Sequence, residues 1–363
     1  MLGSVGGHSL VLGDRFTGRR VGEKELFLDA KGRMAGHGLN IEPARRSAHD
    51  GPDPAEVFLL WTSGLELGGS GLPDSGGRQT LRSAAYHLGM VKDFRFGLGL
   101  HDAQSRAKVQ DAARRAEGLG FDVLHVPDHL RAPAPFPALM SAAAATSTLR
   151  LGTFVLNAGF YKPTLLARDV GAMRDLTEGR FELGLGTGYV REEFEAAELP
   201  YPSARERIDH MQHVIEYVRE HLPDVPILIA GNGDRVLTVA ARHADIIGFT
   251  GGDRAASESE DPLAERIEFV RNAAPDRFDA LELNVAITAM PIDGSGMPDL
   301  KIPRRFLPDL TDEQLLRHPG VLSGSTRDMA DRIRGYRDTY GVSYIVVQAP
   351  HAEVFAKVIA ELR

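Results

Sequence analysis

The chain has 363 residues, 43% of them hydrophobic, which is enough to bury the core of one large α/β barrel or of two ordinary domains. The formal net charge is −8 and no long run of lysine or arginine occurs, so nucleic acid is not an expected partner. The absence of cysteine excludes disulfides, thiolate metal ligands and cysteine nucleophiles. No stretch reaches the roughly 18 apolar residues that span a bilayer. No signal-peptide pattern is seen either, so we expect a cytoplasmic protein without a membrane partner.

Glycine is unevenly distributed, since 17 of the 39 glycines precede Met90. Residues 1–89 show no sustained period of 2 or 3.6, which predicts a poorly ordered glycine-rich extension or a translation start assigned upstream of the true one. A small accessory domain is the alternative interpretation. We predict that residues 90–363 form the folded domain.

From Phe94 onward, short apolar runs alternate with longer amphipathic segments, the pattern of repeated βα units on a parallel sheet. Eight units in order, with nothing to mark a reversal of strand order, predict an α/β fold of the (β/α)8 TIM barrel type. The predicted strands are 94–100, 123–126, 151–156, 181–185, 227–230, 246–249, 281–287 and 344–348. The predicted helices are 106–119, 137–147, 164–176, 204–221, 235–243, 263–272, 326–340 and 353–362.

The long connecting segments at 157–163, 186–202, 250–262 and 288–311 all follow predicted strands. In such barrels the loops after the strands gather at the C-terminal mouth, where active sites are built. Candidate functional residues are therefore those that come directly after each strand.

After the second strand come Asp128 and His129, which we predict as the main catalytic pair. A histidine exchanges a proton near neutral pH, and a carboxylate beside it can fix its tautomer. In the structural alternative, Asp128 caps the next turn and His129 packs against it.

Other strand ends carry aromatic residues or glycines. The third is followed by a loop of residues 157–163, whose aromatics either wall a planar ring or anchor the loop. The fourth runs into Gly186, Thr187 and Gly188, where close approach and free N–H groups suit an anion, although a tight turn explains the pattern equally well. The fifth ends at residues 231–234, before a helix whose N-terminus suits a phosphate, with Asp234 as an alternative N-cap. The sixth ends in a further glycine-rich segment, 248–252.

The sequence lacks the G-x-S-x-G, HExxH, EF-hand and GxxxxGK[ST] motifs. His210, His213 and His221 share one predicted helix, where we favour a solvated face over metal ligation, because no carboxylate is placed with them. We predict no metal site.

Several blocks together resemble the luciferase-like monooxygenase superfamily over about residues 93–350. They are residues 94–97, 120–122 with 127–129, 151–157, 179–188, 230–233, 244–248 and 324–325. Within it the chain looks most similar to the branch that uses coenzyme F420, a deazaflavin that moves hydride. The third-to-fourth-strand block is the most specific part of the resemblance.

The resemblance implies roles for individual residues. Asp128 and His129 would lie by the reacting face of the coenzyme, and Asn157 would contact the edge of its ring. Phe154 and Val155 would form a strand bulge that supports the ring, with a non-prolyl cis peptide between them. The sugar chain or phosphate of the coenzyme would be contacted by Gly186, Thr187, Gly188, Gly231, Asn232 and Thr250.

One residue departs from the family pattern. The sugar-phosphate dehydrogenases of this branch have an acidic residue where this chain has Tyr189, which weakens the case for a sugar-phosphate substrate. Tyr189 either donates a proton or hydrogen bond to the substrate or closes the pocket.

These features predict an oxidoreductase that passes hydride between coenzyme F420 and a small organic substrate. The alternatives are an FMN-dependent monooxygenase that uses reduced flavin and oxygen, and a non-catalytic deazaflavin carrier or sensor. The resemblance also implies that the barrel can pair as a homodimer.

Overall fold

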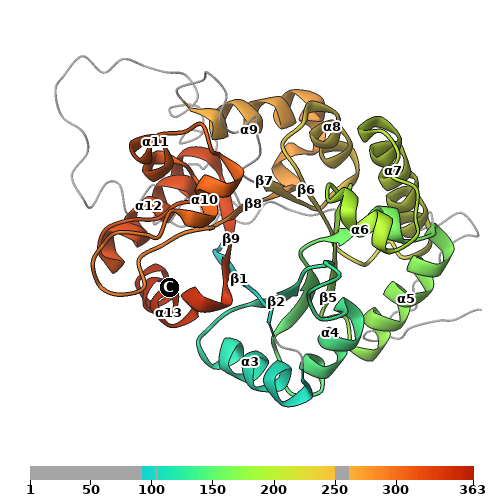
Figure 1. The fold of residues 1–363 in the computed structure, drawn as a ribbon, viewed down its shortest axis with the longest axis horizontal. Coiled ribbons are helices and arrows are strands. Elements are labelled where there is room, and N and C mark those ends of the chain that lie inside the picture. Colours follow the sequence, from blue (N-terminus) through green and yellow to red (C-terminus); the bar gives the residue numbers. More distant parts are fainter. Residues whose placement is uncertain (1–91, 103–104, 250–260) are drawn as a thin grey trace, which may run out of the picture. The chain divides into compact units, whose positions relative to one another are not determined.

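The computed structural model describes residues 92–102, 105–249 and 261–363. The predictions for residues 1–89 and for Thr250 lie outside this part of the chain. All pairings between neighbouring strands are parallel, and β3 pairs with β5 to close the ring, so the predicted barrel is confirmed (Figure 1). The strands are β1 (Arg95–Gly99), β2 (Val123–Val126), β3 (Arg150–Thr153), β4 (Leu156–Asn157), β5 (Phe181–Gly186), β6 (Ile227–Ala230), β7 (Ile246–Phe249), β8 (Glu282–Ala286) and β9 (Val342–Gln348).

The helices that follow the strands match their predicted positions to within a few residues. They are α3 (Arg106–Gly118), α4 (Pro135–Ala143), α5 (Pro163–Leu176), α7 (Ala204–His221), α8 (Asp234–His243), α9 (Pro262–Ala273), α12 (Thr326–Tyr340) and α13 (Ala352–Leu362). The described residues also contain three short helices that we did not predict. Two lie inside the long segments 186–202 and 288–311, namely α6 (Arg191–Ala196) and α10 (Lys301–Phe306), and α11 (Asp312–Arg317) directly follows the second segment. Three short 3₁₀ segments connect neighbouring elements among the described residues: η1 (Ala158–Phe160), η3 (Pro275–Ala280) and η4 (Ala349–His351). No helix in the described ranges is long and apolar enough to cross a membrane.

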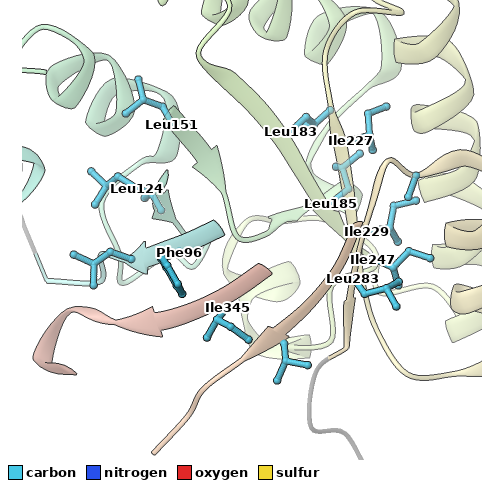
Figure 2. Close-up of a cluster of buried hydrophobic side chains, with 14 of the residues drawn as sticks. Phe96, Leu124, Leu151, Leu183, Leu185, Ile227, Ile229, Ile247, Leu283 and Ile345 are labelled. Carbon is cyan, nitrogen blue, oxygen red and sulfur yellow. The ribbon is translucent and has the colours of Figure 1, made fainter. Parts of the chain in front are cut away.

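The main hydrophobic core lies between the strands and the surrounding helices. Apolar side chains from successive strands, shown in Figure 2, belong to the same buried cluster as residues of α3, α4, α5, α7 and α8. Burial of each such leucine or isoleucine stabilises the fold by about 1.5–3 kcal/mol. This layer fixes the helices around the ring and so sets where the loops after the strands begin.

The barrel interior contains a buried polar cluster rather than a purely apolar filling. The Tyr344 hydroxyl donates a hydrogen bond to Glu182 Oε1 at 2.9 Å, and Arg95 forms an ion pair with Glu182 Oε2 at 2.6 Å. His125 Nε2 also hydrogen-bonds to the Tyr344 hydroxyl. Because burial lowers the pKa of His125 to about 4, its ring is neutral near pH 7.

The N-terminal side of β3 is tied to α3 by one carboxylate. Glu117 accepts hydrogen bonds from the backbone N–H groups of Ser147, Thr148 and Leu149 at 2.7–3.0 Å. Partial burial alone would raise the pKa of Glu117, but these donors outweigh it and hold the pKa at about 2.

We therefore expect Glu117→Gln to destabilise the protein by about 1 kcal/mol at pH 7, allowing for solvent screening. A depressed carboxyl pKa contributes stability above the unfolded-state value near 4.5, and that contribution is lost as the pH falls towards 2. Urea unfolding of both proteins between pH 7 and pH 3.5 should show the difference shrinking. A difference that stays constant with pH would contradict this role of the carboxylate.

Candidate active site

The third barrel strand is interrupted at the mouth. Strand β3 ends at Thr153 and β4 begins at Leu156, and the Phe154–Val155 peptide bond between them is cis, as predicted. The Thr153 hydroxyl donates to Gly184 O at 2.9 Å and accepts from Gly184 N at 2.8 Å. These bonds join the third strand to β5 where the regular ladder is broken. Phe154 and Val155 pack on the apolar residues of the barrel interior and form a floor beneath the mouth.

Asp128 is hydrogen-bonded to the backbone at the break between β3 and β4. Its N–H donates to Val155 O at 3.3 Å, and its Oδ2 accepts from Asn157 N at 3.1 Å. A further hydrogen bond links its carboxylate to the Tyr161 side chain. Burial raises the pKa of Asp128 despite these donors. The Asp128 carboxylate thus binds the neighbouring loop. The His129 ring is held by another residue.

That residue is Glu193, which the sequence analysis did not identify. His129 Nδ1 lies 3.1 Å from both oxygens of Glu193, and the same carboxylate accepts from Leu130 N at 3.2 Å. The Glu193 side chain is 16% exposed and that of His129 is 40% exposed. A neutral imidazole that donates from Nδ1 to a carboxylate leaves Nε2 free to accept a proton. The pair has the geometry of a positioned general acid or base.

Tyr189 stands beside this pair. Its ring lies edge-on to the His129 ring, with centroids 6.2 Å apart, and the residue is 66% exposed. The Tyr201 hydroxyl donates to Tyr189 O at 3.2 Å, and Arg207 donates to Gly188 O at 2.9 Å. The loop that carries Tyr189 is therefore fixed through its backbone, while the phenol faces solvent at the mouth.

The glycines after the fourth barrel strand permit close packing. A Cβ added at Gly186 would lie 2.8 Å from Val155 Cγ2, and one added at Gly188 would collide with the Asn157 amide. Gly188 also has a positive φ of 70°, which disfavours other residues. Thr187 lies between them and is partly buried. Val155, Asn157 and the 186–188 segment thus form one continuous wall.

The residues after the fifth barrel strand have different roles from each other. An added Cβ at Gly231 would lie 2.7 Å from Val236 Cγ1, so the glycine allows β6 and α8 to pack closely. Asn232 is buried and lines a separate cavity beside β7 and β8. The expected alternative role of Asp234 as N-cap is wrong, because Gly233 is the N-cap and Asp234 is bound by Arg266 at 2.7 Å.

Among the described residues, no group of three or more histidine or carboxylate side chains could hold a metal ion. The expected solvated position of His210 is wrong, since its Nε2 contacts the carbonyl oxygens of Ala158 and Tyr161 at 3.2 and 3.0 Å. It anchors the loop after β4, a role that helix periodicity does not reveal.

A closed parallel barrel with polar and aromatic side chains gathered at the carboxyl ends of its strands defines a TIM-barrel enzyme scaffold. Residues 87–293 match the model of the luciferase-like monooxygenase family. The chain therefore belongs to the luciferase-like monooxygenase family and is an oxidoreductase of that type.

The chain is similar to F420-dependent dehydrogenases in sequence and to several solved structures in fold. The chain is 27% identical over 300 residues to the F420-dependent glucose-6-phosphate dehydrogenase of Intrasporangium calvum, covering 67% of this chain and 89% of the relative. It is 25% identical over 296 residues to that of Kineococcus radiotolerans, covering 67% and 87%. Among solved structures, the F420-dependent tetrahydromethanopterin reductase of Methanopyrus kandleri shares the fold with a TM-score of 0.61 at 17% identity, covering 75% of this chain and all of that one. An FMN complex of 3,6-diketocamphane monooxygenase from Pseudomonas putida has a TM-score of 0.57 at 16% identity, covering 75% and 98%.

Proposed function

We propose that the protein passes hydride between coenzyme F420 and a small organic substrate, with His129 as the proton donor or acceptor. The observation that carries the proposal is the His129 imidazole, held through Nδ1 by Glu193 and open to the mouth of the barrel. The dehydrogenases that match this chain over most of their length support the coenzyme assignment.

The described residues fit a flat coenzyme ring with a polar tail. Phe154 and Val155 would support the ring, the Asn157 amide would meet its edge, and the 186–188 segment would contact the tail. When bound, the deazaflavin supplies the hydride chemistry, while the protein orients both reactants.

His129 and its neighbours would handle the proton. With Nδ1 committed to Glu193, Nε2 accepts a proton from an alcohol as it is oxidised, or returns one to a carbonyl in the reverse direction. Tyr189, edge-on to the same ring, would hydrogen-bond the substrate oxygen. Asp128 would act indirectly, by fixing the backbone of Val155 and Asn157.

Equilibrium binding of F420 and of FMN, followed by fluorescence quenching, tests the coenzyme assignment. Tight F420 binding with weak FMN binding is the expected result. The reverse preference would replace the proposal with an FMN-dependent monooxygenase, which the FMN-bound structure of the same fold makes the second candidate. F420 binding without reduction by any of a panel of alcohols and sugar phosphates would instead favour a carrier or sensor.

The wall formed by Val155, Asn157 and residues 186–188 would contact the coenzyme. Gly188→Ala places a Cβ against the Asn157 amide at a positive φ, so we expect the Kd for F420 to rise about tenfold or more. Gly335→Ala is the matched control, because this glycine lies within α12 and an added Cβ meets nothing within 4 Å. Equal F420 affinity in the two variants would show that the wall does not contact the coenzyme.

Glu193 is proposed as a positioning residue, because it would act on the substrate only through the His129 ring. Glu193→Gln removes the charge that holds the His129 ring, so we expect kcat to fall about tenfold with little change in KM. Glu192→Gln changes an exposed neighbour on the same helix and should leave kcat unchanged. Steady-state kinetics with the best substrate of the panel provide the test. A rise in KM without a fall in kcat would assign Glu193 to substrate binding instead.

A further inference from the structure

A small cavity lies between the carboxyl ends of β7 and β8 and the start of α9. Three of the residues that line it are polar and more than nine-tenths buried: Asn232 and Arg266 are 8% exposed and His318 is 9% exposed. The remaining lining is mostly apolar and includes Phe249, Leu263 and Val285. Buried polar groups of this kind are normally hydrogen-bonded, because leaving one without a partner costs about 1–3 kcal/mol.

Each of the three polar side chains has a buried nitrogen without a partner among the described residues. They are Asn232 Nδ2, Arg266 Nε and His318 Nε2. His318 Nδ1 accepts from Gly320 N at 3.0 Å, so the neutral ring carries its proton on Nε2. Burial, helped by Arg332, lowers the pKa of His318 to about 4, which keeps the ring neutral near pH 7. All three unpartnered groups are therefore hydrogen-bond donors.

Among the described residues, the positive and negative charges beside the cavity are equal in number. The two terminal nitrogens of the Arg266 guanidinium are paired with Asp234 and Glu265, which leaves Nε as the unpaired donor. Arg332, which lies near His318, adds a second positive charge. Within the described part of the chain, two guanidinium groups and two carboxylates thus lie around a neutral imidazole and a neutral amide. An added dianion would disturb the balance of these four charges, whereas an uncharged acceptor would not.

We propose that this cavity is a subsite for an uncharged carbonyl oxygen of the substrate, such as that of a ketone or an amide. The assignment of this carbonyl to the substrate rests on the proposed function, whereas the binding of a carbonyl in the cavity does not. A carbonyl oxygen accepts two hydrogen bonds and donates none, so it complements N–H groups that lack an acceptor. Water fits less well, because its own two hydrogens need acceptors. The subsite would select a carbonyl compound over a phosphorylated sugar.

The test is a titration of the full chain, labelled with ¹⁵N-histidine, with acetamide and acetone as uncharged probes. Acetate and inorganic phosphate, at constant ionic strength, are the charged comparisons. His318→Asn keeps an acceptor near Gly320 N and identifies the His318 Nε2–H signal by its loss. We expect the uncharged probes to shift this signal saturably and to bind more tightly than acetate or phosphate.

Two asparagine variants make the test specific. Asn232→Leu removes one donor from the cavity and should weaken acetamide binding about 3- to 10-fold. Asn272→Leu changes an exposed asparagine at the end of α9 and should bind like the parent. If Asn232→Leu does not fold, saturation-transfer spectra of acetamide with His318→Asn should show the same loss.

Two results would overturn the proposal. Absence of a saturable shift with both uncharged probes would leave water as the occupant, and tighter binding of acetate or phosphate would assign the cavity to an anion. A titration repeated with F420 at saturation separates two sources of the carbonyl. Acetamide binding that persists assigns the subsite to the substrate, and acetamide that is displaced assigns it to a carbonyl of the coenzyme. Because the first titration contains no coenzyme, failure of F420 to bind leaves its outcome unaffected.

Discussion

Replacing His129 with asparagine is expected to lower kcat by about 10²- to 10⁴-fold, the range that general acid or base catalysis contributes. The Kd for F420 should stay nearly unchanged, because the coenzyme wall is built by other residues, namely Val155, Asn157 and Gly188. Asparagine retains a polar group near Glu193 but does not exchange a proton near neutral pH. Stopped-flow measurement of F420 reduction, together with equilibrium F420 binding, separates the two effects.

Two controls make this experiment decisive. His213→Asn alters an exposed histidine of α7 and should leave both constants unchanged. His129→Gly opens space at a side chain that is already 40% exposed, so added imidazole should restore part of the lost rate. A His129→Asn variant with the parent's kcat, or a rate loss explained wholly by weaker F420 binding, would remove His129 from proton transfer.

Features that depend on residues close together in the sequence were the ones that the sequence predicted. The helices predicted at 204–221 and 326–340 begin at capping boxes of Ser203 and Ser325, a signal between residues three apart, and the structure contains both. Strand positions followed from apolar runs that are themselves local. The cis peptide between Phe154 and Val155 came from the family resemblance, and no pattern of composition or period predicts it.

The contacts that complete the candidate site are long-range, so periodicity did not reveal them. Glu193 lies 64 residues from His129, and the two meet because the folded barrel places α6 next to the residues that follow β2. The short α6 has too few turns to give a clear amphipathic period. Similarly, Asn232, Arg266 and His318 come from three separate segments, and only the closed barrel places them around one cavity. The strand ends were predictable, whereas the partners of the side chains after them were not.

The largest expected loss of stability comes from the barrel interior. Glu182 is fully buried and joins Arg95 to the Tyr344 hydroxyl. Burial alone would raise the pKa of Glu182, but the Arg95 guanidinium, together with the other groups around the carboxylate, holds that pKa below its usual range, so the carboxylate is charged. Glu182→Ala would leave a guanidinium and a phenol without this shared partner. We expect it to destabilise the protein by about 3–5 kcal/mol in urea unfolding.

Glu353→Ala is the matched control, since it breaks an ion pair with Arg115 in which both side chains are more than half exposed. It should cost less than about 1 kcal/mol. The interior cluster also connects to the site, because the His125 ring lies 5.2 Å from the Phe154 ring. Loss of Glu182 should therefore weaken F420 binding as well, by loosening the floor under the ring. If Glu182→Ala unfolds at the same urea concentration as Glu353→Ala, the cluster does not stabilise the barrel, and the position of Phe154 must depend on the apolar contacts alone.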